Sequence, residues 1–193
     1  DEKSSNDFGK NIIPAMLEKG ERMAAYRFEG YWKDVGTIDS LWDANMDMLA
    51  VDSGVQLFDP SWPIYARTPT KPPHFMGSKA VVSHSMVTGG CEVYGEVENS
   101  VLFHSVRVEE GARVKYSILM PGSVVKAGAV VEYAIVAENA VIGEGARVGA
   151  PPEADKPEEW GIAVVAEGIK VGDGARVPAK SMVTRNVKSG GVR

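Results

Sequence analysis

The chain has 193 residues, of which 44% are hydrophobic and 24% charged, an ordinary balance for a soluble globular protein. Its net charge of −5 at pH 7 gives no reason to expect nucleic acid as a partner, and no apolar run is long enough to cross a membrane. The single cysteine, Cys91, excludes an internal disulfide and fits a reducing environment, so we expect a cytoplasmic protein. Because the opening residues are polar and include no initiator methionine, we expect the chain to be a piece of a longer protein.

The N-terminal region predicts one helix and one strand. The stretch from Asp7 to Gly20 can form a short helix with Asn6 or Asp7 as its N-cap. Pro14 is compatible with this helix only in its first turn. The following sequence RMAAYRF, at residues 22–28, alternates between two sets of side chains, which predicts a strand.

An aromatic segment, EGYWKDVGT, follows at residues 29–37 and leads into a second predicted helix. Thr37 is a good N-cap for that helix, and Asp39 in its first turn would interact favourably with the helix dipole. Six side chains then recur at helical spacing, which predicts that this face packs against another element. They are Ile38, Leu41, Trp42, Asn45, Met48 and Leu49.

Composition changes at about residue 54. Residues 54–79 hold five prolines and four aromatic residues, which excludes a regular helix and indicates an extended segment packed against a neighbour. We therefore divide the chain into residues 1–53, the end of an α/β domain, residues 54–80, a proline-rich linker, and residues 81–193, a repeat domain.

The region from about Val81 to Val187 repeats every six residues, with small residues, glycine and charges between aliphatic ones. The recurring positions are Val108 and Val114, then Val124, Val130, Val136, Ile142 and Val148, then Val165, Val171, Val177 and Val183. A longer repeat of seventeen makes Ser100, Ser117 and Ala134 equivalent. A unit this short cannot bury a core alone, so the pattern predicts a parallel β-helix. Each coil should have three strands, one inward aliphatic residue per strand and one shortened corner.

Other motifs in the repeat region have ordinary structural interpretations. The glycine-rich stretches at residues 143–145 and 172–174 follow the six-residue repeat and precede no helix, so we interpret them as corners rather than phosphate loops. Residues 149–161 break the repeat and should loop out, with Trp160 holding the loop back. The arginines that recur at turns could bind an anion but are more simply solvated. They are Arg107, Arg113, Arg147 and Arg176.

Two groups of residues near the N-terminus are candidates for chemistry. Asp7 and Phe8 lie at the helix start, where capping is the simpler interpretation. Asp34 lies beside Trp32 in a glycine turn after a predicted strand, a place where α/β enzymes gather ligands. A hard divalent ion such as Mg²⁺ takes one or two carboxylates together with phosphate oxygens. From residue types alone, a metal ligand and a turn cap are about equally compatible with Asp34.

Three stretches together resemble the C-terminal half of bacterial glucose-1-phosphate adenylyltransferase, also called ADP-glucose pyrophosphorylase. They are SSNDFGKNIIP at residues 4–14, EGYWKDVGTIDSLWDANMDML at residues 29–49, and the hexapeptide repeats. The resemblance implies a mainly β fold. This would be a left-handed parallel β-helix preceded by the tail end of an α/β nucleotidyltransferase catalytic domain.

The family forms ADP-glucose and pyrophosphate from ATP and glucose 1-phosphate, in glycogen biosynthesis. By the resemblance, Asp7 and Phe8 would line the glucose 1-phosphate pocket. Trp32 would lie against the sugar, and Asp34 would be one of two carboxylates that hold Mg²⁺. The nucleotide loop, the other metal carboxylate and the catalytic basic residues belong to the family's first half, so no catalytic residue is expected here. Members are homo- or hetero-tetramers that use the β-helix in assembly and in regulation by metabolites.

Two alternatives stay open. A hexapeptide-repeat acyltransferase would use His84 or His104 as a general base, although surface or corner histidines are the simpler interpretation. A non-catalytic regulatory subunit of the adenylyltransferase family would share the same fold. Such a homologue would be free to lose Asp7 and Asp34, so the presence of both favours the enzyme.

Overall fold

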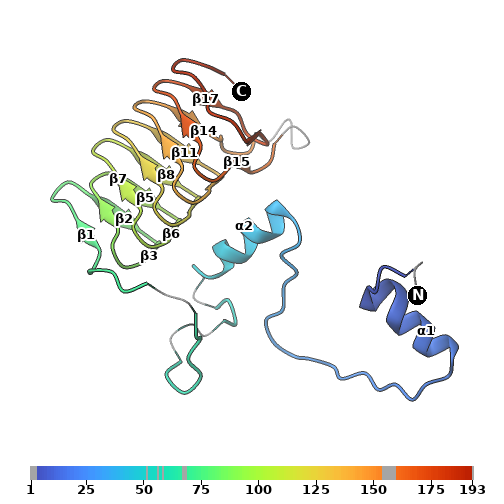
Figure 1. Cartoon of the computed structure of the whole chain (residues 1–193). Coiled ribbons are helices and arrows are strands. Elements are labelled where there is room, and N and C mark those ends of the chain that lie inside the picture. Colours follow the sequence, from blue (N-terminus) through green and yellow to red (C-terminus); the bar gives the residue numbers. More distant parts are fainter. Residues whose placement is uncertain are drawn as a thin grey trace. The chain divides into compact units, whose positions relative to one another are not determined.

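The computed structural model describes residues 4–50, 52–55, 57, 59–66, 69–153 and 160–192. The chain forms two units, Asp1–Gly30 and Tyr31–Arg193, each with its own internal contacts (Figure 1). Across these described ranges, no helix has both the length and the apolar character needed to cross a bilayer.

The first unit contains the predicted N-terminal helix. A π-helical turn, η1 (Phe8–Ile12), continues into α1 (Ile13–Glu18). The Asp7 side chain accepts a hydrogen bond from a backbone N–H of the first turn, and Gly20 adopts a positive φ of 66° beyond the last. Pro14 lies in the first turn of α1, where its missing N–H leaves no helical bond unmade.

The strand predicted at residues 22–28 is wrong. These residues are all exposed and belong to no strand in the part of the unit that the structure describes. A strand is stabilised by pairing, because its backbone N–H and C=O groups need partners. The alternation of side chains alone therefore does not produce a strand here.

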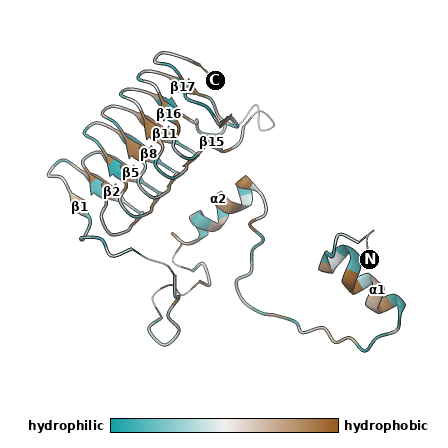
Figure 2. Cartoon of the chain, viewed as in Figure 1, coloured by the Kyte–Doolittle hydropathy of each residue, from teal (hydrophilic) through white to brown (hydrophobic). Residues whose placement is uncertain are grey.

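Helix α2 (Ile38–Asp47) is the first helix of the second unit and begins at the predicted cap. Thr37 accepts a hydrogen bond from the backbone N–H of Ser40, and the Ser40 hydroxyl accepts one from the Thr37 N–H, which completes a capping box. Asp39 lies in the first turn, as predicted. Figure 2 shows hydrophobic and hydrophilic residues on different parts of the α2 surface, as expected for a helix that packs on one side.

The rest of the second unit is a parallel β-solenoid built from three six-stranded sheets, which confirms the predicted fold (Figure 1). Sheet A consists of β1 (Phe75–Met76), β4 (Glu92–Val93), β7 (Arg107–Val108), β10 (Val124–Val125), β13 (Val141–Ile142) and β16 (Lys170–Val171). Sheet B consists of β2 (Val81–Ser83), β5 (Glu96–Glu98), β8 (Arg113–Lys115), β11 (Val130–Glu132), β14 (Arg147–Val148) and β17 (Arg176–Val177). Sheet C consists of β3 (Met86–Val87), β6 (Val101–Leu102), β9 (Ile118–Leu119), β12 (Ala134–Val136), β15 (Ala163–Val165) and β18 (Met182–Val183).

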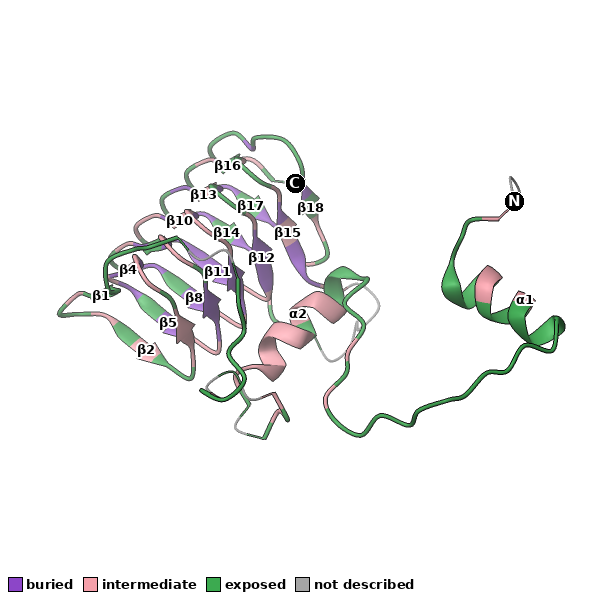
Figure 3. Ribbon diagram, turned by 60° about the horizontal axis from the view of Figure 1, so that its bottom comes forward, coloured by how far each residue is buried: buried purple, intermediate pink, exposed green. Residues whose placement is uncertain are grey.

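The interior of the solenoid is filled by aliphatic side chains from the strands and by small or aliphatic residues between them, such as Val106 and Ala129. In a central coil, Val125 of sheet A, Val131 of sheet B and Val136 of sheet C are fully buried (Figure 3). The first step is six residues and the second is five, so the corner between sheets B and C is the shortened one. Val125 pairs with Ile142 of the next coil, which confirms the predicted coil of seventeen residues.

The predicted inward register is wrong by one residue at two positions. Counting in sixes selects Val124 and Val130, but the interior cluster contains Val125 and Val131 instead. Both strands carry a Val-Val pair, so hydrophobicity does not distinguish the two members. Counting back in sixes from Val136 also passes over the five-residue corner. The other recurring positions are buried as predicted. They are Val108, Val114, Val136, Ile142, Val148, Val165, Val171, Val177 and Val183.

The corners repeat their conformation from coil to coil. Positive φ recurs between sheets A and B at Gly111, Gly128, Gly145 and Gly174, which confirms that the two glycine-rich stretches are corners. The shortened corner between sheets B and C uses other residues, with φ between 43° and 49°. They are His84, Asn99, Tyr116 and Tyr133. The left-handed conformation costs a non-glycine residue about 1 kcal/mol or more, so other contacts must hold the two tyrosines there.

A column of serine hydroxyls supports the same corner. Ser100 and Ser117 are fully buried and lie in equivalent positions of successive coils. The Ser100 hydroxyl accepts the backbone N–H of Ser117 at 3.1 Å, and the Ser117 hydroxyl accepts that of Ala134 at 3.2 Å. Each hydroxyl thus satisfies a buried N–H group between two sheets, where the strand ladder does not reach.

The insertion predicted at residues 149–161 leaves the solenoid intact around it. Val141 of β13 still pairs with Lys170 of β16, twenty-nine residues on. The Trp160 indole N–H donates to the Ala150 carbonyl at 2.8 Å, and its ring meets Tyr133 edge-on. Trp160 therefore holds the end of the insertion to its beginning, as predicted, while residues 154–159 lie outside the described residues.

The proline-rich segment ends in contact with the solenoid. Strand β1 lies inside the predicted linker and pairs with β4. The N–H of Gly90 donates to the Pro72 carbonyl at 2.7 Å, so the chain just before β1 is also packed against the first coil. The boundaries at residues 53/54 and 80/81 stay predictions.

The outer face of sheet B carries mostly charged side chains, with Val130 among them. Val130 lies there between Arg113 and Arg147, its register neighbours on the two sides, and its side chain is only 8% exposed. Long arginine side chains cover apolar neighbours with their stems. The four arginines predicted at turns are instead the first residues of strands. These strands are β7, β8, β14 and β17.

We predict that Val131→Asp unfolds the solenoid, whereas Val130→Asp is tolerated. The carboxylate introduced at position 131 would be buried without a partner, at a cost of about 4 kcal/mol or more. The carboxylate introduced at position 130 would lie on the outer face between two guanidinium groups. Thermal melts of the two variants, followed by circular dichroism, measure the difference. Equal melting temperatures, or a lower one for Val130→Asp, would show that the register is misassigned.

Candidate functional site

The segment just before α2 presents its side chains alternately to two sides. Tyr31 and Lys33 are half-buried, whereas Trp32 is 77% exposed and Asp34 is exposed. Successive side chains of an extended chain point to opposite sides. The two residues predicted to meet the sugar and the metal therefore share one exposed side of the segment.

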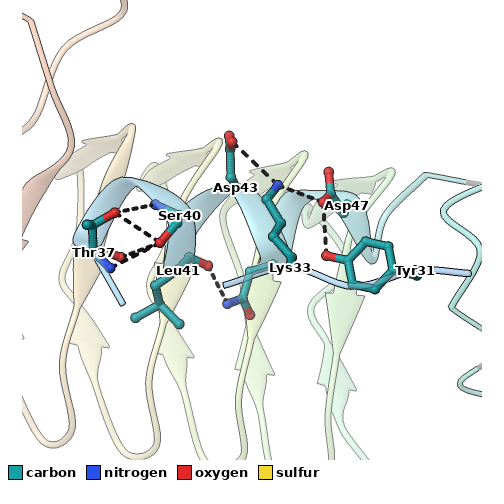
Figure 4. A network of polar contacts seen from close by, with 8 residues as sticks. Tyr31, Lys33, Thr37, Ser40, Leu41, Asp43 and Asp47 are labelled. Carbon is teal, nitrogen blue, oxygen red and sulfur yellow. Dashed lines mark hydrogen bonds and ion pairs between the residues drawn. The ribbon is translucent and has the colours of Figure 1, made fainter. Parts of the chain in front are cut away.

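The half-buried pair is held by the acidic side of α2 (Figure 4). The Lys33 ammonium lies 2.7 Å from a carboxylate oxygen of Asp47 and 3.4 Å from one of Asp43. The Tyr31 hydroxyl donates to the same Asp47 oxygen at 3.0 Å. One carboxylate near the end of α2 thus receives both inward side chains of the segment.

The contacts among Tyr31, Lys33 and Asp47 shift the pKa values of all three side chains. The hydrogen bond from Lys33 lowers the pKa of Asp47, and the same bond raises the pKa of Lys33. Burial, followed by the hydrogen bond to Asp47, raises the pKa of Tyr31. A lowered carboxyl pKa adds stability that is lost only as the pH falls through it, and a raised ammonium pKa adds stability lost only as the pH rises through it. The ion pair therefore persists across the neutral range.

Asp34 forms a local turn with one carboxylate oxygen and leaves the other able to bind a metal ion. Its Oδ1 atom accepts a hydrogen bond from the backbone N–H of Gly36 at 3.0 Å. Its other oxygen has no hydrogen-bond donor among the residues that the structure describes. The turn-cap interpretation is thus correct as geometry, and it leaves a carboxylate oxygen directed to the exposed side.

Asp7 and Phe8 belong to the first unit, whereas Trp32 and Asp34 belong to the second. The Asp7 carboxylate caps η1, and its backbone N–H donates to the Asn11 side chain at 3.2 Å. Phe8 is 73% exposed. Their predicted contacts with glucose 1-phosphate stay predictions, as does the contact of Trp32 with the sugar.

The donor set in this chain fits one part of a magnesium site. The described residues contain no group of three or more His, Cys, Asp or Glu side chains able to hold a metal ion. Mg²⁺ keeps several waters and takes only one or two carboxylates beside phosphate oxygens. A single exposed carboxylate such as Asp34 is compatible with that ligand set, provided that the substrate phosphates and a further carboxylate complete it.

Helix α2 is itself attached to the solenoid at the shortened corner. The Trp42 indole N–H donates to the Tyr116 carbonyl at 2.7 Å, and its ring lies 6.0 Å from that of Tyr133. The two tyrosine rings stack at 4.8 Å, and Leu41 packs with Trp42 against a small cluster around Ile118. These contacts supply the interactions that hold both tyrosines in the left-handed conformation.

The two histidines proposed for an acyltransferase lie at corners. His84 has a positive φ of 43° and its Nδ1 lies 2.6 Å from the Asn99 side-chain oxygen, so this nitrogen is already engaged. The Nδ1 atom of His104 is buried and has no hydrogen-bond partner within the described ranges.

The solenoid and the segment before it define a hexapeptide-repeat protein joined to the end of a nucleotidyltransferase domain. Residues 71–171, more than half of the chain, match the family model described as "GlmU-like, C-terminal hexapeptide", so the chain belongs to this family. Residues 1–51 match the family model described as "Nucleotidyl transferase". The second match favours a transferase of the nucleotidyltransferase kind over an acyltransferase.

Proteins named glucose-1-phosphate adenylyltransferase are similar to the chain, as its resemblance predicted. The one from Clostridium perfringens (strain 13 / Type A) is 54% identical over 121 residues, which are 63% of this chain and 31% of that protein. Those from Bacillus mycoides (strain KBAB4) and Bacillus cereus (strain ATCC 10987 / NRS 248) are 50% identical over 119 residues, 62% of this chain and 32% of each protein. The matched region is thus about a third of the length of these relatives.

The contacts of Lys33 with Asp43 and Asp47 were not anticipated from the sequence. Two signals could have indicated them. Asp43 and Asp47 are four residues apart, which places both on one side of α2. Tyr31 and Lys33 also alternate with Trp32 in the segment, so the two polar side chains share a direction.

We predict that Trp42→Ala releases α2 from the solenoid and leaves the solenoid folded. The substitution removes the ring packing and the hydrogen bond to the Tyr116 carbonyl, together worth about 2 kcal/mol for a half-buried site. Amide hydrogen exchange in α2 should then speed up by more than tenfold while exchange in the solenoid strands is unchanged. Trp62→Ala is the control, because Trp62 is 82% exposed. Unchanged exchange in α2 would contradict this docking.

Proposed function

We propose that this chain is the C-terminal portion of a glucose-1-phosphate adenylyltransferase, which forms ADP-glucose and pyrophosphate from ATP and glucose 1-phosphate in glycogen biosynthesis. The observation that supports it most is the combination of two findings. The first 51 residues match a nucleotidyl transferase model, and relatives 50–54% identical carry the adenylyltransferase name. In this reaction a phosphate oxygen of the sugar phosphate attacks the α-phosphorus of ATP, and pyrophosphate leaves.

The chain would contribute contacts to the sugar phosphate. Trp32 offers an exposed aromatic face, a common surface for the apolar side of a sugar ring. Asp7 and Phe8 would line the glucose 1-phosphate pocket, with the Asp7 carboxylate as an acceptor for sugar hydroxyls. Their work is binding and orientation, which carry much of the catalysis in phosphoryl chemistry.

Asp34 would hold Mg²⁺ together with a second carboxylate and the nucleotide phosphates. When bound, the ion offsets the charge that develops toward the leaving pyrophosphate. The residue's part is to present a hard anionic oxygen at a fixed place, which the hydrogen bond from Gly36 favours by restricting the carboxylate. An ion held by one aspartate and phosphates would not need a cluster of ligands in this chain.

The solenoid would serve assembly into a homo- or hetero-tetramer and regulation by metabolites, in the cytoplasm. The edge strands of its terminal coils have unpaired backbone N–H and C=O groups, which a partner subunit could cover, as in other solenoids. A non-catalytic regulatory subunit is the second candidate for the same fold. Because Asp7 and Asp34 are both present with exposed carboxylates, the enzyme is the better-supported proposal.

The isolated 193-residue chain should form no ADP-glucose. It supplies one candidate metal carboxylate and, over its described residues, no cluster of metal ligands, so it cannot position a magnesium nucleotide alone. An assay of purified chain with ATP, glucose 1-phosphate and Mg²⁺ measures this. Turnover close to that of a complete adenylyltransferase would contradict the proposal that this chain supplies only part of the substrate and metal contacts.

In the whole enzyme, Asp34→Asn should lower kcat by about a hundredfold or more while the fold is unchanged. Asparagine keeps the size and one acceptor oxygen, so the hydrogen bond from Gly36 survives, but the charge that a metal needs is lost. Kinetics across a magnesium titration, with circular dichroism for the fold, give the answer. Near-normal kcat at ordinary magnesium would leave Asp34 as a turn cap only. Asp39→Asn, at another exposed aspartate, is the matched control.

A further inference from the structure

We propose that Asp47 is a positioning residue that holds the Trp32–Asp34 segment through Lys33 and Tyr31, and so links the solenoid to the substrate site. The proposal rests on the proposed function in one respect, namely that Trp32 and Asp34 meet the substrates. The link itself is a property of the described contacts. It runs from the solenoid corner to α2, from α2 to Asp47, and from Asp47 to the segment.

The first step is that side chains, rather than the backbone ladder, fix the segment. Residues 31–36 belong to no helix or strand, and within the described ranges no backbone–backbone hydrogen bond involves them. Their polar attachments are the contacts of Tyr31 and Lys33 with Asp47, the ion pair of Lys33 with Asp43, and the turn between Asp34 and Gly36. The turn is local, so the contacts with α2 are what place the segment.

The second step is that Asp47 carries most of this attachment. Its carboxylate receives both donors, and its side chain is 37% exposed. Asp43 is 59% exposed and lies 3.4 Å from the ammonium, against 2.7 Å for Asp47. A shorter, less exposed ion pair is less weakened by solvent and salt. Removal of the Asp47 charge should therefore matter more than removal of the Asp43 charge.

The third step is that the contacts of Tyr31 and Lys33 with Asp47 determine which way Trp32 and Asp34 point. With Lys33 and Tyr31 drawn toward α2, the alternation of the chain turns Trp32 and Asp34 away from it. Lys33 is thereby occupied by two carboxylates and is not the cation that meets the sugar phosphate. Its role is to orient its neighbours on either side.

The fourth step is that α2 cannot move freely. Trp42 and Leu41 pack on the solenoid, with the indole N–H bonded to the Tyr116 carbonyl. A shift of the shortened corner would carry α2 and Asp47 with it, and the segment would follow. The structure thus gives the solenoid a physical connection to the two exposed residues, eight to ten residues N-terminal to Trp42.

The experiment uses the whole enzyme with Asp47→Asn, Lys33→Met and Lys33→Arg. Asp47→Asn and Lys33→Met should each raise the Mg²⁺ concentration for half-maximal activity by about tenfold, as for other residues that orient a metal ligand. Limited chymotryptic cleavage after Tyr31 and Trp32 should speed up in both, because a released segment fits a protease more readily, while cleavage within the solenoid stays as in the unchanged enzyme. Lys33→Arg should restore both readouts, because a guanidinium also bonds to carboxylates.

Two controls separate the possible failures. Asp39→Asn, on the same helix, should change neither readout. If Asp47→Asn leaves cleavage after Tyr31 and Trp32 and the Mg²⁺ requirement unchanged while Asp34→Asn abolishes turnover, the positioning role is wrong and the proposed function stands. If Asp34→Asn has no effect, the proposed function fails, and with it any role of Asp47 in the reaction. The cleavage measurement on Lys33→Met still tests the attachment of the segment to α2 if Asp47→Asn does not fold.

Discussion

The parallel pairing of each coil with the next, fifteen to eighteen residues on except across the insertion, is the constraint on which the rest of the structure depends. Parallel strands in register place equivalent side chains above one another, as Val125 and Ile142 show. Each strand contributes only one or two interior side chains, so no coil could exclude water from its own interior. Stability comes from the stacking of coils. Because the coils stack in register, equivalent residues of successive coils lie in a column along the solenoid.

At the shortened corner, equivalent residues of successive coils form a column that binds α2. Tyr116 and Tyr133 occupy a backbone conformation that disfavours residues with a side chain, but their rings stack on each other. The Tyr133 ring also meets Trp42, whose indole N–H donates to the Tyr116 carbonyl. An unfavourable local conformation thereby produces an aromatic surface that one helix can recognise. The stacked tyrosines determine where α2 packs on the solenoid. The contacts of α2 with Tyr31 and Lys33 then determine the position of the Trp32–Asp34 segment.

The sequence predicted the solenoid because its signal is repeated over many coils, whereas single-window patterns were less reliable. The Val-Val pairs at 124–125 and 130–131 hid the inward register, since both members are equally apolar. The alternation at residues 22–28 predicted a strand, but pairing is a property of neighbours that a local pattern does not contain. Trp32 and Asp34 were selected as candidates from their motif, and their roles stay predictions. The attachment to Asp47 was not anticipated, because it depends on how α2 is oriented.

The insertion between β13 and β16 has a consequence for how such a protein can change. These strands are twenty-nine residues apart and still pair as strands seventeen residues apart do. The extra chain leaves and returns at one corner, so the coils on either side stay stacked. Long additions at a corner can therefore accumulate without any change to the core. A single residue added within a strand would exchange its inner and outer faces.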